Sequence, residues 1–197
     1  NVMASYSAWN GVRMHAHRDL LTGVLKDAWG FEGFVVSDWE GIELIDPDYD
    51  AAVEASINAG VDMSMVPFDA GRFMDTLERL VQAGRVPRAR IDDAVRRILA
   101  VKVRMGLFTS SAADRPSLEG VGCRDHRALA RDAVAASQTL LENHGDLLPL
   151  PTSGRSLLVA GPAADDVGLA CGGWTISWMG AAGETTPGTT LLDGIRE

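Results

Sequence analysis

Apolar positions in the first hundred residues alternate between compact runs and helically spaced repeats. The compact runs are short and continuous, as strands buried on both faces require, and they lie at residues 2–7, 33–37 and 61–66. The helically spaced repeats each end near a glycine, and they predict helices at residues 20–28, 51–59, 69–83 and 91–105. Strands that alternate with helices over short connections predict parallel strands joined by crossover helices.

The pattern changes after residue 108. Residues 109–122 are rich in Ser, Gly and Pro and poor in large apolar side chains, which predicts a linker. Helical spacing resumes over 125–143, and residues 156–161 form another apolar run that predicts a buried strand. We therefore expect an α/β domain over 1–108, a linker over 109–124 and the start of a second α/β domain over 125–197.

Composition excludes several classes of protein. The 197 residues include 18 Lys and Arg against 27 Asp and Glu, and the net charge of −9 argues against a nucleic-acid partner or an anionic membrane surface. Cys123 and Cys171 lack metal-ligand spacing and cannot form a disulfide scaffold. No apolar run is long enough for a membrane span. The chain begins without Met, directly at a predicted strand, so we expect an internal fragment of a longer protein.

The strongest candidate for chemistry is Asp38, which follows a buried strand and precedes Trp39. In parallel α/β barrels the catalytic groups lie at the carboxyl ends of the strands. A carboxylate beside an indole suits a sugar, because the indole stacks on the pyranose and the carboxylate attacks or stabilises the anomeric carbon. The alternative is that Asp38 caps a turn and Trp39 packs in the core.

A second candidate is the glycine-rich segment at residues 171–180, which carries Trp174 and Trp178. Its indoles either line a binding surface or form a contact between domains. Two weaker candidates have simpler explanations. His15 and His17 lack further metal ligands, which favours a polar loop that caps the next helix. The alternating aspartates at 46, 48 and 50 lack the glycine and twelfth-position carboxylate of a calcium loop, which favours a solvated loop.

Several segments together resemble glycoside hydrolase family 3. They are Met3-Ala4-Ser5-Tyr6-Ser7-Ala8-Trp9-Asn10-Gly11, Leu20-Leu21-Thr22, Trp29 to Trp39 with its Ser37-Asp38-Trp39 block, Arg90 to Leu99, Lys102 to Phe108, and Leu147-Leu148-Pro149-Leu150. The Cys171-Gly172-Gly173-Trp174-Thr175-Ile176 segment, with Trp178, is similar to the branch of exo-acting β-glucan glucohydrolases and β-glucosidases. The resemblance covers essentially the whole chain.

The resemblance implies the C-terminal part of a TIM-type barrel followed by the start of an α/β sandwich, with the active site between them. It implies that Asp38 is the nucleophile of a retaining glycosidase. Trp39 and Trp178 would clamp the sugar, Trp174 would lie near that pocket, and Tyr6 and Met3 would line the site close to the nucleophile. No metal or organic cofactor is implied, and the partners would be β-glucosides or β-glucan oligosaccharides.

The chain also departs from the family pattern. The sugar-binding Asp, Arg and Lys-His of earlier barrel strands have no counterpart here, and neither Glu184 nor Glu197 is assigned as the acid/base. Two alternatives stay open: a β-xylosidase, α-arabinofuranosidase or β-N-acetylhexosaminidase of the same family, or an inactive, truncated sugar-binding fragment. A periplasmic or extracellular location is expected by analogy alone, and the oligomeric state is unknown.

Overall fold

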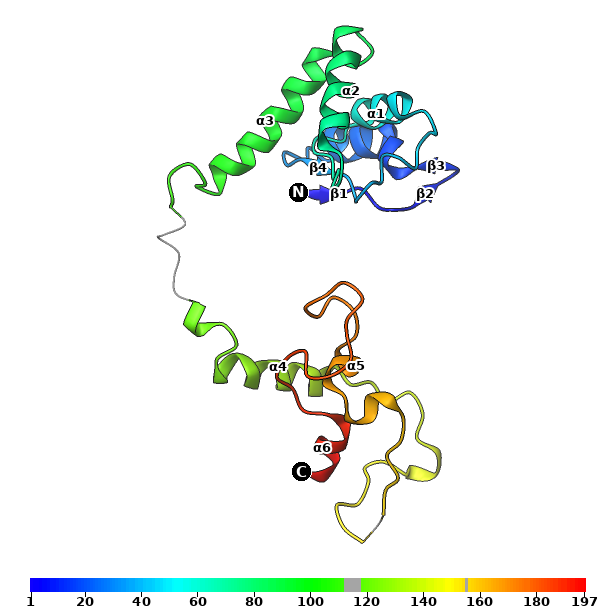
Figure 1. Ribbon diagram of the computed structural model, residues 1–197, viewed down its shortest axis with the longest axis vertical. Coiled ribbons are helices and arrows are strands. Elements are labelled where there is room, and N and C mark those ends of the chain that lie inside the picture. Colours follow the sequence, from blue (N-terminus) through cyan, green and yellow to red (C-terminus); the bar gives the residue numbers. More distant parts are fainter. Residues whose placement is uncertain (112–117, 155) are drawn as a thin grey trace. The chain divides into compact units, whose positions relative to one another are not determined.

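The computed structural model describes residues 1–111, 118–154 and 156–197. The chain divides into two compact units, residues 1–120 and 121–197, called unit 1 and unit 2 below (Figure 1). The predicted linker at 109–124 lies partly outside the described residues, at 112–117, so its limits stay predictions.

The centre of unit 1 is a small parallel sheet. β1 (Val2–Met3) pairs in parallel with β4 (Val35–Val36), and the register places Val2 opposite Val35. On its other side β4 forms a single parallel bridge from Val36 to Met63. The two predicted apolar runs at 33–37 and 61–66 therefore lie side by side, although the second forms one bridge and not a full strand. Both residues of β4 are buried, as predicted, and Val35 packs in one apolar cluster with Leu21 and Ala59 from the helical segments at 19–28 and 49–59.

A hairpin interrupts the expected course of the first strand. β2 (Ala8–Trp9) pairs in antiparallel fashion with β3 (Val12–Arg13), and the turn between them is Asn10-Gly11. Both turn residues have positive φ, 48° and 79°, as a type I′ hairpin turn requires. The predicted strand over 2–7 is thus limited to Val2–Met3, because the backbone turns away into the hairpin.

Helices follow the strands at the predicted positions. η1 (Met14–Ala16) is a 3₁₀ turn, η2 (Asp19–Ala28) is a π-helix, and three α-helices follow: α1 (Tyr49–Ala59), α2 (Ala70–Gln82) and α3 (Arg88–Arg104). The predicted stop signals are confirmed, since the glycines at 30, 60, 84 and 106 all adopt positive φ after these helices. α1 packs against α2 and η1, and it shares one apolar cluster with α2.

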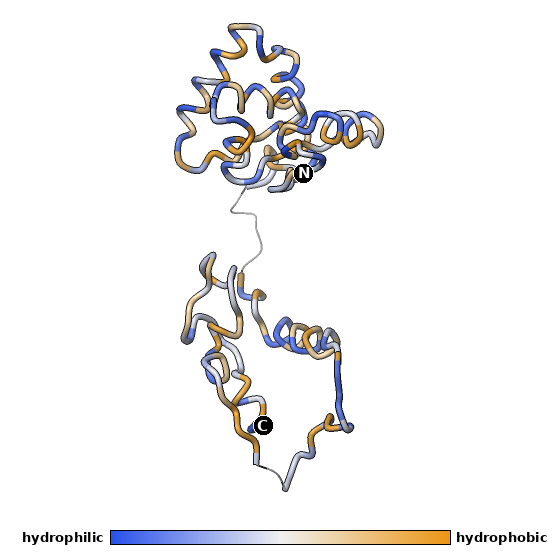
Figure 2. The backbone as a smooth tube through the Cα atoms, turned by 90° about the vertical axis from the view of Figure 1, so that its right-hand side faces the viewer, coloured by the Kyte–Doolittle hydropathy of each residue, from blue (hydrophilic) through white to orange (hydrophobic). Residues whose placement is uncertain are grey.

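Unit 2 has little buried apolar surface. Its α-helices are α4 (Arg124–Ser137), α5 (Val167–Cys171) and α6 (Leu191–Arg196). Its short 3₁₀ turns are η5 (His144–Asp146) and η6 (Pro162–Asp165). Another 3₁₀ turn, η4 (Leu118–Gly120), lies at the end of unit 1. Hydrophobic residues occur in both units (Figure 2). Among the described residues, however, every buried hydrophobic side chain lies between Ala4 and Ala94.

One expectation for unit 2 holds in part and another is wrong. The helix predicted over 125–143 forms as α4 but ends at Ser137, and the run at 156–161 forms no strand among its described residues. Leu158 is 94% exposed. The physical reason is that an apolar run becomes a buried strand only where another strand accepts its hydrogen bonds, and the described part of unit 2 pairs none with it.

Candidate active site

The carboxyl ends of the parallel segments converge in unit 1. The Ala4 amide donates to the Val36 carbonyl at 2.8 Å, and the Ser37 amide donates to the Met63 carbonyl at 2.9 Å. Beyond these bonds the three segments leave the sheet together. Tyr6, Asp38 and Met65 therefore emerge at one edge, which is the edge where parallel α/β sheets place their functional groups.

Asp38 begins a tight and strained turn. Trp39 and Glu40 have φ of 33° and 51°, a left-handed conformation that few residues other than glycine adopt. The Glu40 amide donates to the Met65 carbonyl at 3.1 Å, and the Met65 amide donates to Oγ of the fully buried Ser37 at 2.7 Å. Because both sides of the turn are bound to the neighbouring segment, the strained conformation is fixed.

His15 binds the backbone of Asp38. The Asp38 amide donates to Nε2 of His15 at 3.0 Å, and the His15 side chain is 2% exposed. The Tyr6 ring meets the imidazole edge-on, with the ring centroids 6.5 Å apart. Burial lowers the pKa of His15; the nearby Asp38 carboxylate opposes this shift and Arg13 adds to it. The imidazole is therefore neutral near pH 7, with Nε2 free to accept.

The interpretation of His15 and His17 as a polar capping loop is wrong. Both side chains are buried, and the N-cap of η2 is Arg18, which makes no side-chain capping bond. The His17 ring lies against Trp9, with centroids 5.6 Å apart. Sequence alone missed this because η1 brings His15 to the backbone of Asp38, 23 residues further along the chain.

The predicted sugar-contacting residues of unit 1 are accessible. Asp38 is partly exposed, and Met3, Tyr6 and Trp39 are about half exposed. Trp39 is no core residue; its ring meets that of Phe68 edge-on, with centroids 6.0 Å apart. The edge thus offers a carboxylate with apolar and aromatic surface beside it, which is the combination that stacks on a sugar ring.

The two tryptophans of unit 2 lie at the two ends of a short loop. The Trp174 amide donates to the Trp178 carbonyl at 2.9 Å, and Thr175 bridges to Ser177 between them. Gly180 permits this closure, because a Cβ there would lie 2.4 Å from the Gly172 carbonyl oxygen. Both indoles are largely exposed. Trp39 and Trp178 belong to different units, so the predicted clamp stays a prediction.

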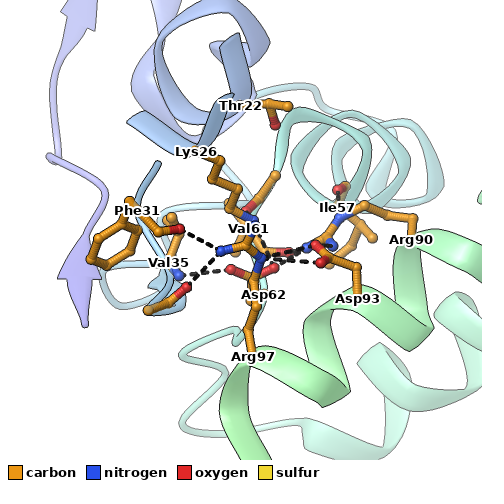
Figure 3. Close-up of polar contacts among 12 residues, drawn as sticks. Thr22, Lys26, Phe31, Val35, Ile57, Val61, Asp62, Arg90, Asp93 and Arg97 are labelled. Carbon is orange, nitrogen blue, oxygen red and sulfur yellow. Dashed lines mark hydrogen bonds and ion pairs between the residues drawn. The ribbon is translucent and has the colours of Figure 1, made fainter. Parts of the chain in front are cut away.

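A buried ionic cluster lies at the opposite, amino end of the same strands (Figure 3). The Asp62 carboxylate accepts from the Val35 amide and from Nζ of Lys26, each at 2.8 Å, and also from the Arg90 guanidinium. Nζ of Lys26 also donates to the Gly60 carbonyl at 2.8 Å. Burial lowers the pKa of Lys26, although its bond to Asp62 opposes that shift.

Arg97 extends this cluster to the residues before β4. Its guanidinium donates to the carbonyls of Phe31 and Gly33 and to the carboxylate of Asp93, which also binds Arg90 (Figure 3). α3 is thereby joined to the sheet. Sequence reasoning missed this cluster, because Lys and Arg at helical spacing are normally solvated. Its position away from Asp38 indicates a structural role, consistent with the stabilising face of α/β barrels.

The alternating aspartates have structural roles. Oδ1 of Asp46 accepts from the Asp48 amide, Asp48 caps the start of α1, and Asp50 pairs with Arg79. Among the described residues no group of three or more His, Cys, Asp or Glu side chains is placed to hold a metal ion. Within the same residues, no helix is both long and apolar enough to cross a membrane.

Comparisons with known proteins agree on one family. Residues 1–101 match the family model described as the glycosyl hydrolase family 3 N-terminal domain. The chain is 37% identical to a lysosomal β-glucosidase of Dictyostelium discoideum, covering 100% of this chain and 25% of that protein. It is 36% identical to a periplasmic β-glucosidase of Salmonella typhimurium, covering 99% and 26%.

A solved structure is similar over nearly the whole chain. The crystal structure of an exo-1,3/1,4-β-glucanase from a Pseudoalteromonas species matches with a TM-score of 0.88 and 40% identity, covering 99% of this chain and 25% of that one. The chain thus spans about a quarter of the length of the relatives that it matches.

Proposed function

This chain belongs to glycosyl hydrolase family 3, and we propose that it carries part of the active site of a retaining, exo-acting β-glucosidase or β-glucan glucohydrolase. The observation that carries the proposal is the position of Asp38. Its carboxylate is partly exposed at the carboxyl edge of the parallel segments, beside the exposed indole of Trp39, on a turn fixed by hydrogen bonds from both sides.

Asp38 would act as the nucleophile in two steps. Its carboxylate attacks the anomeric carbon and displaces the leaving oxygen, which the acid/base protonates, to give a covalent glycosyl-enzyme. Water, activated by the same acid/base, then releases glucose with retained configuration. In such enzymes the two carboxyl groups stand about 5 to 5.5 Å apart. We assign no acid/base among residues 1–197.

The aromatic residues would hold the sugar. Trp39 and Trp178 would grip its two faces, Trp174 would extend the pocket, and Tyr6 and Met3 would line it beside Asp38. Exposure of all five side chains supports this assignment. Stacking on a pyranose face tolerates different ring rotations, so several β-glucan linkages would be accepted.

The domain organisation that goes with this function is also a proposal. Residues 1–108 would be the C-terminal part of a TIM-type barrel, 109–124 a linker, and 125–197 the start of an α/β sandwich. The parallel, helix-covered segments of unit 1 support the first of these. A periplasmic or extracellular location is proposed by analogy with the relative named a periplasmic β-glucosidase, whereas the other relative is named lysosomal.

Mechanism-based trapping tests this function in the full-length gene product. A 2-deoxy-2-fluoro-β-glucoside should inactivate the enzyme and leave a label on the peptide that contains Asp38. Asp38→Asn should abolish turnover, because an amide does not attack the anomeric carbon. Glu40→Gln, two residues away, is the matched control and should retain activity. Labelling of another residue, or full activity in Asp38→Asn, would refute the assignment.

A further inference from the structure

We propose that His15 is a positioning residue, whose neutral imidazole holds the nucleophile in place by accepting the backbone amide hydrogen of Asp38 at Nε2. The inference rests on the proposed function, because it assumes that Asp38 is the nucleophile. Its direct support is the 3.0 Å bond between the Asp38 nitrogen and Nε2, made by a side chain that is 2% exposed.

The imidazole is confined by its neighbours. A Cβ at Gly41 would lie 2.5 Å from both Cε1 and Nε2 of His15, so only a residue without a side chain fits there. The Tyr6 ring meets another side of the imidazole edge-on. A ring packed in this way has a fixed orientation, and its Nε2 therefore fixes the position of the Asp38 amide that it binds.

The contact differs from those of the neighbouring amides. Ser37 and Glu40 donate to backbone carbonyls of Met63 and Met65, whereas Asp38 donates to the side chain of a distant turn. The strained residues Trp39 and Glu40 follow directly, so the direction of the Asp38 side chain depends on how its own amide is fixed. The Asp38 carbonyl accepts from Oγ of Ser37 and from the Gly41 amide, so the bond to His15 is the one that fixes its amide side.

The protonation state of His15 decides whether the contact exists. A neutral imidazole with its proton on Nδ1 accepts at Nε2, whereas an imidazolium donates at both nitrogens and cannot accept. The charged groups that face the ring are the Asp38 carboxylate and the Arg13 guanidinium, and Tyr6 is the titratable neighbour. Burial lowers the pKa of His15, which supports the neutral form near pH 7.

Two amide substitutions at His15 separate positioning from packing. In His15→Gln the amide oxygen lies about as far from Cβ as Nε2 does, so it can accept from Asp38, and it does not titrate. In His15→Asn the side chain is one carbon shorter, so its amide oxygen does not reach the Asp38 amide. His17→Asn is the matched control, because that ring contacts Trp9 and its loss leaves the Asp38 bond intact.

The readouts are kcat, KM and the rate of trapping by a 2-deoxy-2-fluoro-β-glucoside in the full-length enzyme. We expect His15→Asn to lose roughly a hundredfold in kcat and trapping rate with little change in KM, as a misplacement of about 1 Å does. His15→Gln should recover most of that loss, and His17→Asn should stay close to wild type.

Each outcome decides the matter. Equal kcat values for His15→Asn and wild type, or equal losses in His15→Asn and His15→Gln, would overturn the positioning role while Asp38 stays the nucleophile. A wild-type enzyme that is neither active on β-glucosides nor trapped would overturn the proposed function and this inference together. If the variants do not fold, neutron diffraction of the wild-type enzyme replaces them: the proposal requires a proton on Nδ1 of His15, and a proton on Nε2 overturns it.

Discussion

Gly41→Ala tests the support beneath the proposed nucleophile without touching a group that reacts. The new Cβ would lie 2.5 Å from Cε1 and Nε2 of His15, so the ring must move by about 1 Å to regain ordinary van der Waals contact. His15 is buried and cannot move into solvent. The substitution should therefore overpack the site and break the hydrogen bond from the Asp38 amide.

The magnitude follows from these two effects. Overpacking a buried site costs about 1 to 3 kcal/mol, and a buried amide left without an acceptor costs about 1 to 3 kcal/mol. If the ring moves, it relieves the overpacking but breaks the hydrogen bond, so the two costs do not add fully. We expect a loss of about 2 to 4 kcal/mol in the free energy of unfolding and roughly a hundredfold loss in kcat.

Urea unfolding followed by tryptophan fluorescence, together with kcat on an aryl β-glucoside, measures both effects in the full-length protein. Gly23→Ala is the matched control, because a Cβ there meets nothing within 4 Å and alanine is the better helix former in η2. It should leave kcat unchanged and the unfolding midpoint equal or slightly higher. A Gly41→Ala protein as stable and as active as wild type would refute the packing argument.

Three further predictions concern other parts of the chain. Asp62→Asn should cost about 3 to 5 kcal/mol in unfolding free energy, because it leaves buried cations uncompensated, whereas Asp92→Asn, in an exposed pair, should change the urea midpoint little. The pKa of His15 is lower in the folded state than in the unfolded state, so the unfolded chain binds more protons near pH 6. The melting temperature should therefore fall on acidification below about pH 6.5. A His15→Gln protein should lose the part of this pH dependence that His15 contributes. Trp178→Ala should weaken oligosaccharide binding by roughly tenfold, and glucose binding less, in titration calorimetry; unchanged affinity would show that this indole does not face Trp39 across the sugar.

In unit 1, local patterns determined the helices and their ends. α1, α2 and α3 lie within a few residues of the predicted ranges, because apolar spacing and a following glycine are properties of the chain itself. The family resemblance carried by the Ser37-Asp38-Trp39 block was likewise visible in the sequence, and the family comparison confirms it. Parallel pairing among the apolar runs at 2–7, 33–37 and 61–66 was also predicted, from the helices that join them.

Pairing and burial, in contrast, were decided by the tertiary structure. The run at 156–161 has the composition of a buried strand, yet it forms none among its described residues, because a strand needs a partner that composition does not supply. His15 and Lys26 are polar residues whose partners lie far along the chain, and only the fold brings them against the Asp38 amide and the Asp62 carboxylate. A sequence records which groups are present. Their burial, and hence their hydrogen bonds and charge states, depends on neighbours that lie twenty or more residues away, and only the folded chain sets those neighbours.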